Sequence, residues 1–537
     1  MSLPLTSGAL IELIPVTRKV LVWLVLLLLT IGGFSVRAQH LRGADGTLGE
    51  DEARLALAAQ GILNTGVPTM PSGKIYLRGV ISSYLTVLSL WLFGRHDFAA
   101  RLPNTVVGAL LIPLLFFFGR TLAGTTGGFC LAVFAAIQPE LVRWSTSAWM
   151  TSLFIVLFTG ATYLLYLGYE RDRLSFQVSG AAASVLTVLA HELGVLLALA
   201  VLLTVVIRTA RSDFNWFGGR RSTTALMILG FSLLLFVALG LFLRAGSVAG
   251  PLGEFKHYLD PSLSLNRFFR DYTRWRSDYL PLAAAVVLGI PLLLRSLKSG
   301  GLFLYATISV ASFTIWVIIA KDSERYGLVL IPLLPLAATW AVAEIVRLTG
   351  IWSRLEDRAV GRIRAGAIVL LFAASLRNDL AVATLWPEAR ERTWLTEFRA
   401  LGVAPGDLFL SDNPEIPAWY LGKTDYWERS ENYERYTYAS GNYIRHAYTG
   451  AVKVGNTLDL FTLVQANPGK TIWYLGDEPG LENVPPTVRD RLLRAAGLVR
   501  RTEDGMIILR IDLSDPELIG PEGAASPVSE NVGRQAP

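Results

Sequence analysis

An acidic cluster stands shortly after the first long apolar segment of this sequence. Its residues, Gly49-Glu50-Asp51-Glu52-Ala53-Arg54, place three carboxylates in a row beside one guanidinium. Carboxylates are costly at the edge of a lipid bilayer, so a cluster retained there favours a chemical role such as proton transfer. The alternative is structural, because acidic side chains in the first turn of a helix also stabilise the helix dipole.

Cations suited to binding phosphate occur at two other places. Arg78 lies in Tyr76-Leu77-Arg78-Gly79, and an arginine can hold a phosphate with two parallel hydrogen bonds. Lys321 and Arg325 are four residues apart, so on a helix they share one face and can both reach a phosphate. The alternative for this pair is a membrane anchor that is paired with neighbouring acidic residues.

Two polar pairs interrupt the apolar segments further along the chain. They are Glu140 with Arg143, and His191 with Glu192. Each pair either approaches a polar substrate or forms a hydrogen-bonded turn. Asp51 and Glu52 are adjacent and point about 100° apart on a helix, which is poor geometry for chelation. Because the sequence also has no Asp-X-Asp motif and no His or Cys ligand spacing, we expect no required metal and no cofactor.

The composition requires a membrane to position these residues. The chain has 537 residues, of which 52% are hydrophobic and only 17% are charged. About 20 apolar residues span a bilayer. Runs near that length predict about eleven spans, at 20–36, 104–119, 125–141, 148–168, 176–190, 193–207, 223–243, 280–294, 302–320, 326–346 and 365–385.

The distribution of arginine predicts the orientation of these spans. With the N-terminus in the cytoplasm, the short connections that contain Arg120, Arg171, Arg208 and Arg347 lie inside, as the positive-inside rule requires. The candidate residues then share the external face, and an odd number of spans places the C-terminus outside as well. Since Lys and Arg mostly separate apolar spans, the net charge of +6 does not indicate nucleic-acid binding.

The sequence predicts three regions of different character. Residues 1–385 form a transmembrane catalytic domain, and residues 386–515 form a soluble external α/β domain. In the second region, 407–411, 471–475 and 506–511 have the pattern of strands, and 489–496 that of a helix. Residues 516–537 are rich in Pro, Gly, Ser and Glu, and we expect this tail to be disordered.

Two short helices are expected in the first external loop. Residues 49–64 begin with acidic residues and end before Gly66 and Pro68, and residues 79–93 are apolar but too short to span. After them comes Phe98-Ala99-Ala100-Arg101-Leu102-Pro103. This ordered series resembles the first external loop of GT-C glycosyltransferases, particularly the lipid A aminoarabinose transferases and the protein O-mannosyltransferases. The resemblance covers roughly residues 20–345 and is specific in the first loop.

The resemblance implies a role for each candidate residue. Asp51 matches the catalytic carboxylate of an Asp-Glu pair, with Glu52 beside it, and it would deprotonate the acceptor in one inverting displacement. The leaving polyprenyl phosphate would be bound by cations and an aromatic residue, and the remaining polar residues would bind substrate. The phosphate-binding residues would be Arg78, Lys321, Arg325 and Tyr326. The substrate-binding residues would be Arg54, Tyr76, Glu140, His191 and Glu192.

The implied protein is a membrane glycosyltransferase of the hexosyl or pentosyl class. It would transfer a sugar from a polyprenyl-phosphate donor to a lipid, glycan or protein on the periplasmic or extracellular side of the plasma (inner) membrane. Ala148-Trp149-Met150-Thr151 replaces an additional Asp of the aminoarabinose transferases, which argues against membership of that subfamily in the strict sense. The alternatives are a polyprenyl-lipid transporter or flippase, and a noncatalytic envelope-assembly protein.

Overall fold

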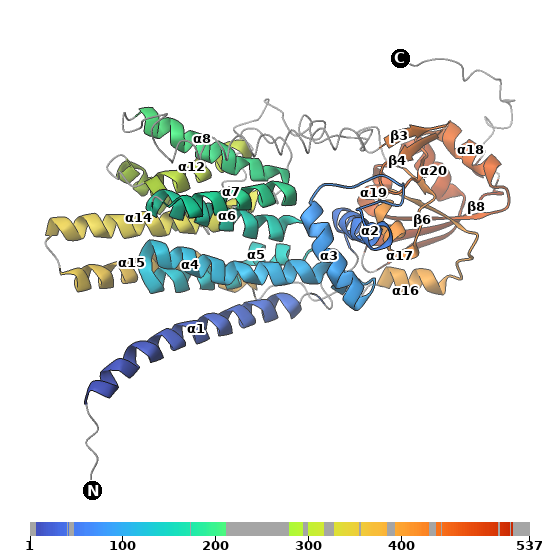
Figure 1. Cartoon of the computed structure of the whole chain (residues 1–537). Coiled ribbons are helices and arrows are strands. Elements are labelled where there is room, and N and C mark those ends of the chain that lie inside the picture. The colour runs from blue at the N-terminus through green and yellow to red at the C-terminus, as the bar shows by residue number, and fades with distance from the viewer. Residues whose placement is uncertain are drawn as a thin grey trace, which may run out of the picture. The chain divides into compact units, whose positions relative to one another are not determined.

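A computed structural model of the chain describes residues 7–39, 41, 48–171, 173–210, 279–293, 299–315, 327–353, 356–383, 393–428, 437–441, 443–502, 505–515 and 517–518. These residues divide into two compact units (Figure 1). The helical unit contains the described residues within 1–42 and 77–388, and the sheet unit contains those within 43–76 and 389–537. The described residues 48–76, which the sequence assigns to the transmembrane domain, therefore pack with the C-terminal sheet.

The helical unit is built from apolar helices. Five of those described are long and apolar enough to cross a membrane. The described helices with their bounds are α1 (Ser7–Gln39), α3 (Val80–Phe93), α4 (Asp97–Ile137), α5 (Pro139–Ser145), α6 (Thr151–Arg171), α7 (Leu174–Ala190), α8 (Val195–Ala210), a helix at Tyr279–Leu293, α12 (Ser299–Phe313), α14 (Leu330–Ser353) and α15 (Asp357–Ala383).

Helices lie at the positions of the predicted spans among the described residues, but those at Leu174–Ala190, Tyr279–Leu293 and Gly300–Phe313 are shorter than a full span, so the predicted number of spans stays a prediction. The predicted spans at 104–119 and 125–141 correspond to α4, whose backbone leaves helical geometry at Ala123 and Gly124. Gly124 has a φ of +78°, which a residue with a side chain rarely adopts, so this break depends on glycine. The predicted span at 223–243 lies outside the described residues.

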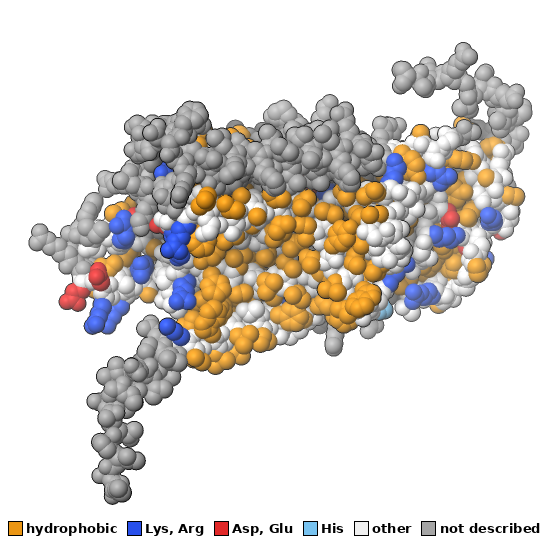
Figure 2. Space-filling model, viewed as in Figure 1, with side chains coloured by type: hydrophobic (Ala, Val, Ile, Leu, Met, Phe, Trp, Pro, Cys, Tyr) orange, Lys and Arg blue, Asp and Glu red, His pale blue; other side chains and the backbone are white. Residues whose placement is uncertain are grey.

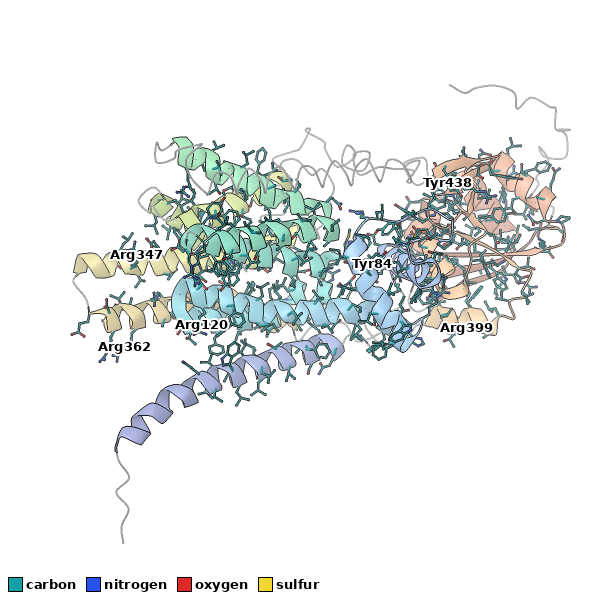
Figure 3. All side chains as sticks on the ribbon, viewed as in Figure 1. Tyr84, Arg120, Arg347, Arg362, Arg399 and Tyr438 are labelled. Carbon is teal, nitrogen blue, oxygen red and sulfur yellow. The ribbon has the colours of Figure 1, made fainter. Side chains whose placement is uncertain are left out.

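Apolar side chains form both the interior and the surface of the helical unit. Phe116, Phe118 and Phe158 are fully buried in its core. Figure 2 shows hydrophobic side chains over much of its visible face, with Lys and Arg gathered at one end. Figure 3 places Arg120, Arg347 and Arg362 toward that end, whereas Tyr84 on α3 lies toward the opposite end.

Helix α3 buries its small polar side chains and exposes its large apolar ones, which is the opposite of an amphipathic helix in a soluble protein. Its small hydroxyl residues Ser82, Ser83, Thr86 and Ser89 are buried, whereas Leu85, Leu88, Trp91, Leu92 and Phe93 are exposed. Trp91 keeps 70% of its surface exposed. Large apolar side chains turned outward on a helix too short to span suit a position in the membrane interface. The buried small side chains let α3 approach α4 and α7 closely.

The sheet unit contains one mixed sheet with the order β3-β4-β5-β2-β1-β6-β8-β7. Strands β5, β2, β1 and β6 are parallel to one another, and the other neighbouring pairs are antiparallel. The strand bounds are β1 (Leu408–Ser411), β2 (Tyr426–Trp427), β3 (Thr437–Ser440), β4 (Tyr443–His446), β5 (Val452–Lys453), β6 (Thr471–Asp477), β7 (Ala496–Arg501) and β8 (Met506–Asp512).

Helices cover this sheet and close its core. They are α16 (Thr393–Ala400), α17 (Glu415–Leu421), α18 (Thr457–Ala466), α19 (Glu478–Glu482) and α20 (Pro486–Arg494). Along β6 the side chains alternate, so Ile472 and Tyr474 join one buried cluster while Trp473 and Leu475 join another. The core therefore has two layers, one on each face of the sheet. The predicted strands at 407–411, 471–475 and 506–511 correspond to β1, β6 and β8.

Helix α2 (Glu50–Thr65) and the segment that follows it also belong to the sheet unit. The helix ends at Gly66, whose φ of +81° is typical of a glycine C-cap. The chain then folds back, so that the backbone of Thr69 passes close to Gly61 on α2. A Cβ atom at Gly61 would lie only 1.9 Å from the Thr69 carbonyl oxygen.

Candidate functional site

The three acidic residues of the cluster have different partners on α2. The Glu52 side chain accepts a hydrogen bond from the Gly49 backbone N–H at 2.9 Å, so it caps the helix. Asp51 Oδ1 and Glu50 Oε1 accept hydrogen bonds from Arg54 at 3.1 Å and 2.5 Å. Glu52 therefore has the structural role of a helix cap. Glu50 and Asp51 instead bind Arg54, which lies one turn further along the helix.

Arg54 is the centre of a buried ionic cluster within the sheet unit. Its side chain is 2% exposed, and its Nε and Nη2 atoms donate to Glu415 Oε1 at 3.0 Å and 2.7 Å. The guanidinium carbon also lies 4.5 Å from the centroid of the Tyr448 ring. Burial lowers the pKa of Arg54, but the charges of Glu415 and then Glu50 outweigh it and raise that pKa well above its ordinary value. Arg54 is therefore a charged, fixed side chain.

A second group of candidate residues comes together in the helical unit. The Arg78 Nη2 atom donates to Glu192 Oε1 at 2.7 Å, and the Arg78 guanidinium lies 5.6 Å from the Trp149 ring. Glu192 belongs to the 3₁₀ turn Glu192–Gly194 between α7 and α8. Burial raises the pKa of Glu192, but the charge of Arg78 and the hydrogen bond from Arg78 outweigh this and lower it to about 2. At neutral pH the Arg78–Glu192 pair is therefore ionised.

His191 occupies the end of α7 next to this ion pair. Its Nδ1 atom accepts a hydrogen bond from the Leu193 backbone N–H at 3.2 Å, and it lies 3.5 Å from Glu192 Oε2. An imidazole that accepts through Nδ1 carries its proton on Nε2. This contact forms the hydrogen-bonded turn that was one of the two alternatives for His191. His191 also lies next to Glu192, the residue that binds Arg78.

The remaining predicted site residues have separate surroundings. Glu140, in the first turn of α5, lies 3.9 Å from Arg143. Tyr76 is 3% exposed and packs edge-to-face on Tyr448 at 5.5 Å between ring centroids. Lys321, Arg325 and Tyr326 lie outside the described residues. Among the described residues, no group of three or more His, Cys, Asp or Glu side chains has a geometry that could hold a metal ion.

Thus the candidate residues fall into two sets, one in each unit. Asp51, Glu52, Arg54 and Tyr76 lie in the sheet unit, and Arg78, Glu140, His191 and Glu192 lie in the helical unit. Glu415 is the residue that the sequence did not indicate, although it binds Arg54 directly. The two are 361 positions apart, and a lone glutamate before six apolar residues gives no signal of such a partner.

The fold was compared with solved structures. The crystal structure of ArnT from Cupriavidus metallidurans in the apo state is similar over 94% of this chain and 99% of that protein, with a TM-score of 0.58 and 15% identity. The family profile described as dolichyl-phosphate-mannose-protein mannosyltransferase matches residues 78–240. This chain has the GT-C glycosyltransferase fold. The resemblance predicted from the first-loop residues is thereby confirmed.

Two further similar structures contain a lipid phosphate. ArnT from Cupriavidus metallidurans bound to undecaprenyl phosphate has a TM-score of 0.53 and 14% identity, with coverage of 94% of this chain and 99% of that one. AglB, the oligosaccharyltransferase of Archaeoglobus fulgidus, was solved with an inhibitory peptide and a dolichol-phosphate. It has a TM-score of 0.54 and 11% identity, and the match covers 92% of this chain and 74% of AglB. No curated protein matches the sequence significantly.

These findings establish the coarse character of the protein. The apolar helices and the GT-C fold indicate a multi-pass membrane protein.

Proposed function

We propose that this GT-C protein transfers a hexosyl or pentosyl group from a polyprenyl-phosphate donor to a hydroxyl of a lipid, glycan or protein acceptor. The observation that carries the proposal is the similarity, over nearly the whole chain, to a GT-C structure that contains undecaprenyl phosphate. A transferase of this kind needs a base for the acceptor and cations for the leaving phosphate. The chain supplies a carboxylate cluster on α2 and an arginine just before α3.

The reaction is one inverting displacement. The acceptor oxygen attacks the anomeric carbon, the bond from that carbon to the phosphate oxygen breaks, and polyprenyl phosphate leaves with the electron pair. Asp51 takes the proton of the acceptor hydroxyl, with Glu52 at the capped start of the same helix. Arg78 stabilises the negative charge on the phosphate, and Lys321, Arg325 and Tyr326 remain predicted phosphate-binding residues.

The active site is proposed to face the periplasmic or extracellular side of the plasma membrane. The positive-inside rule supports this orientation, because Arg120, Arg347 and Arg362 lie toward one end of the helical unit (Figure 3). Helix α3, which follows Arg78, lies toward the other end. His191, Glu192 and Glu140 then approach the sugar or the acceptor from the external turns of the bundle.

The first test is donor turnover by the full-length protein in lipid nanodiscs. Short-chain polyprenyl-phospho-sugars of the hexose and pentose classes are supplied with a crude envelope extract as acceptor, and released polyprenyl phosphate is quantified. We expect release from one donor class, and that class names the sugar. Binding of donor lipid without release from any donor would contradict the proposal and favour a transporter.

Arg78 is the residue whose substitution tests phosphate stabilisation. Because loss of one donor of transition-state stabilisation costs about 100-fold or more in kcat, we expect a loss of that size for Arg78→Gln. Arg78→Lys keeps the charge but not the two-pronged geometry, so we expect about a tenfold loss. Arg143→Gln is the matched control, since Arg143 is 54% exposed and only 3.9 Å from Glu140. Unchanged turnover by Arg78→Gln would remove Arg78 from the mechanism.

A further inference from the structure

We propose that Glu415 of α17 is a positioning residue that fixes Asp51 through Arg54, so that the C-terminal domain controls the geometry of the catalytic carboxylate. The inference rests on the proposed function, because it takes Asp51 as the base. It assigns to the sheet unit a part in the reaction.

The geometry of the Arg54 guanidinium carries the proposal. Its Nε and Nη2 edge grips one carboxylate oxygen of Glu415, at 3.0 Å and 2.7 Å, and its Nη1 atom donates to Asp51 Oδ1 at 3.1 Å. A guanidinium is planar and its N–H groups point in fixed directions. Once Glu415 holds one edge, the direction of the N–H that meets Asp51 is set as well.

The burial of this arrangement makes it rigid. Glu415 has no exposed surface and Arg54 is 2% exposed, whereas the Asp51 side chain keeps 28% of its surface accessible. Asp51 and Glu50, which is 27% exposed, are thus the accessible members of the cluster, whereas Arg54 and Glu415 are enclosed. The face of the Tyr448 ring, 4.5 Å from the guanidinium carbon, limits movement of Arg54 out of its plane.

The cluster holds more negative than positive charge. One guanidinium faces the carboxylates of Glu50, Asp51 and Glu415, and the His446 Nε2 atom lies 3.7 Å from Glu415 Oε1. His446 Nδ1 accepts from the Thr449 backbone N–H at 3.3 Å, which directs the proton of a neutral imidazole toward Glu415. Burial raises the pKa of Glu415 to about 7 against the opposing charge of Arg54, so the charge that Glu415 presents to Arg54 changes with pH near neutrality.

The segment after α2 is attached to the same part of the sheet unit. The Ser72 backbone N–H donates to the Tyr448 carbonyl at 2.9 Å, and Ser72 Oγ donates to the Ala447 carbonyl at 2.5 Å. The Lys74 ammonium lies 4.2 Å from the ring centroid of Tyr438 on β3, which Figure 3 labels. Contacts both on α2 and beyond it therefore tie the helix that carries Asp51 to the sheet unit.

The test compares full-length variants in nanodiscs by donor turnover, pH–rate profile, and amide hydrogen exchange across residues 50–55. For Glu415→Gln we expect kcat to fall about tenfold or more, because small misplacements of a reacting group are costly. We expect KM for the donor to stay within about twofold and exchange at 50–55 to accelerate. We also expect the pH–rate profile to lose the dependence near pH 7 that comes from titration of Glu415, whose pKa burial raises to about 7. Glu397→Gln is the control: it removes a carboxylate, 2.9 Å from Arg500, in the same unit.

A double variant separates positioning from folding. Removing one partner of a buried ion pair strands the other charge, whereas replacing both with apolar side chains is much less destabilising. We therefore expect Arg54→Met/Glu415→Met to unfold near the parent temperature and to keep kcat at least about tenfold low. Recovery of both stability and kcat would make the pair merely structural and overturn the inference.

Two further outcomes distinguish failure of this inference from failure of the proposed function. A parental kcat and pH profile in Glu415→Gln would overturn the inference while leaving the proposed function intact. If the parent protein releases no polyprenyl phosphate from any donor, the proposed function fails and the catalytic role of Glu415 fails with it. Hydrogen exchange at 50–55 would then still report whether Glu415 fixes the start of α2.

Discussion

We expect Asp51→Asn to lower kcat for release of polyprenyl phosphate by at least about 100-fold, the usual contribution of a general base. Asparagine has nearly the same shape as aspartate and keeps an oxygen that can accept from Arg54 Nη1, now 3.1 Å from Asp51 Oδ1. It cannot take a proton from the acceptor. The loss therefore falls on the chemical step, and donor binding should change little.

Glu52 provides the matched control for Asp51. The substitution Glu52→Gln also neutralises one carboxylate of the cluster, but glutamine can still accept the hydrogen bond from the Gly49 N–H. We expect kcat to change by less than about threefold, because the substitution removes only an interaction with the helix dipole, which contributes a few tenths of a kcal/mol. Equal losses in the two variants would mean that the charge of the cluster matters rather than one base. A larger loss in Glu52→Gln would transfer the role of base to Glu52.

The second large effect concerns stability and pH, and it comes from Glu428. This residue follows β2 and its side chain has no exposed surface. Neither of its carboxylate oxygens has a hydrogen-bond partner among the residues that the structure describes. Burial, and then the charge of Asp412, raises the pKa of Glu428 to about 9, although Lys453 opposes the rise. In the folded protein at neutral pH this carboxyl group is therefore protonated.

The sign of the pH dependence follows from proton binding. In the unfolded chain a glutamate titrates near pH ~4.3. Between that value and about 9, the folded state holds a proton at Glu428 that the unfolded state has released. The contribution of Glu428 to the free energy of unfolding therefore falls as the pH rises through this window, by up to about 1.4 kcal/mol per pH unit.

We expect Glu428→Gln to remove this slope and to make the sheet unit several kcal/mol more stable than the parent near pH 9. The measurement is unfolding of the full-length protein in detergent at pH 5, 7 and 9, followed by the fluorescence of the buried Trp394, Trp427 and Trp473. Glu478→Gln is the control, because that side chain is 56% exposed. A parental pH slope in Glu428→Gln would show that this carboxyl group does not titrate as described.

Much of the fold could be predicted from the sequence because its signals are local. A bilayer demands long apolar runs, and the connection that contains Arg120 separated the predicted spans 104–119 and 125–141. The structure has a break close to this connection, at Ala123 and Gly124. The bounds predicted for the two first-loop helices, 49–64 and 79–93, fall within one residue of α2 and α3. Capping residues and glycines at their ends supplied those bounds.

The site was less accessible to this reasoning because its partners are distant along the chain. The spacing of Glu50 and Asp51 to Arg54 is a local helical signal, and both contacts are present. Glu415 is not local to either, so the sequence assigned Arg54 to substrate instead. Tyr76 shows the same limit, since it was predicted to bind substrate and it packs on Tyr448. Both roles in substrate binding stay predictions.

The outward-facing apolar side chains of α3 bear on the shape of the surrounding lipid. A helix that lies in one interface takes up area in that leaflet and none in the other. With Leu88, Trp91 and Leu92 exposed, α3 acts as a wedge that spreads the headgroups on its own side. The free energy of such an interfacial helix depends on membrane curvature and on lipid composition. Membrane curvature and headgroup size thus become variables of its environment, separate from the chemistry of donor and acceptor.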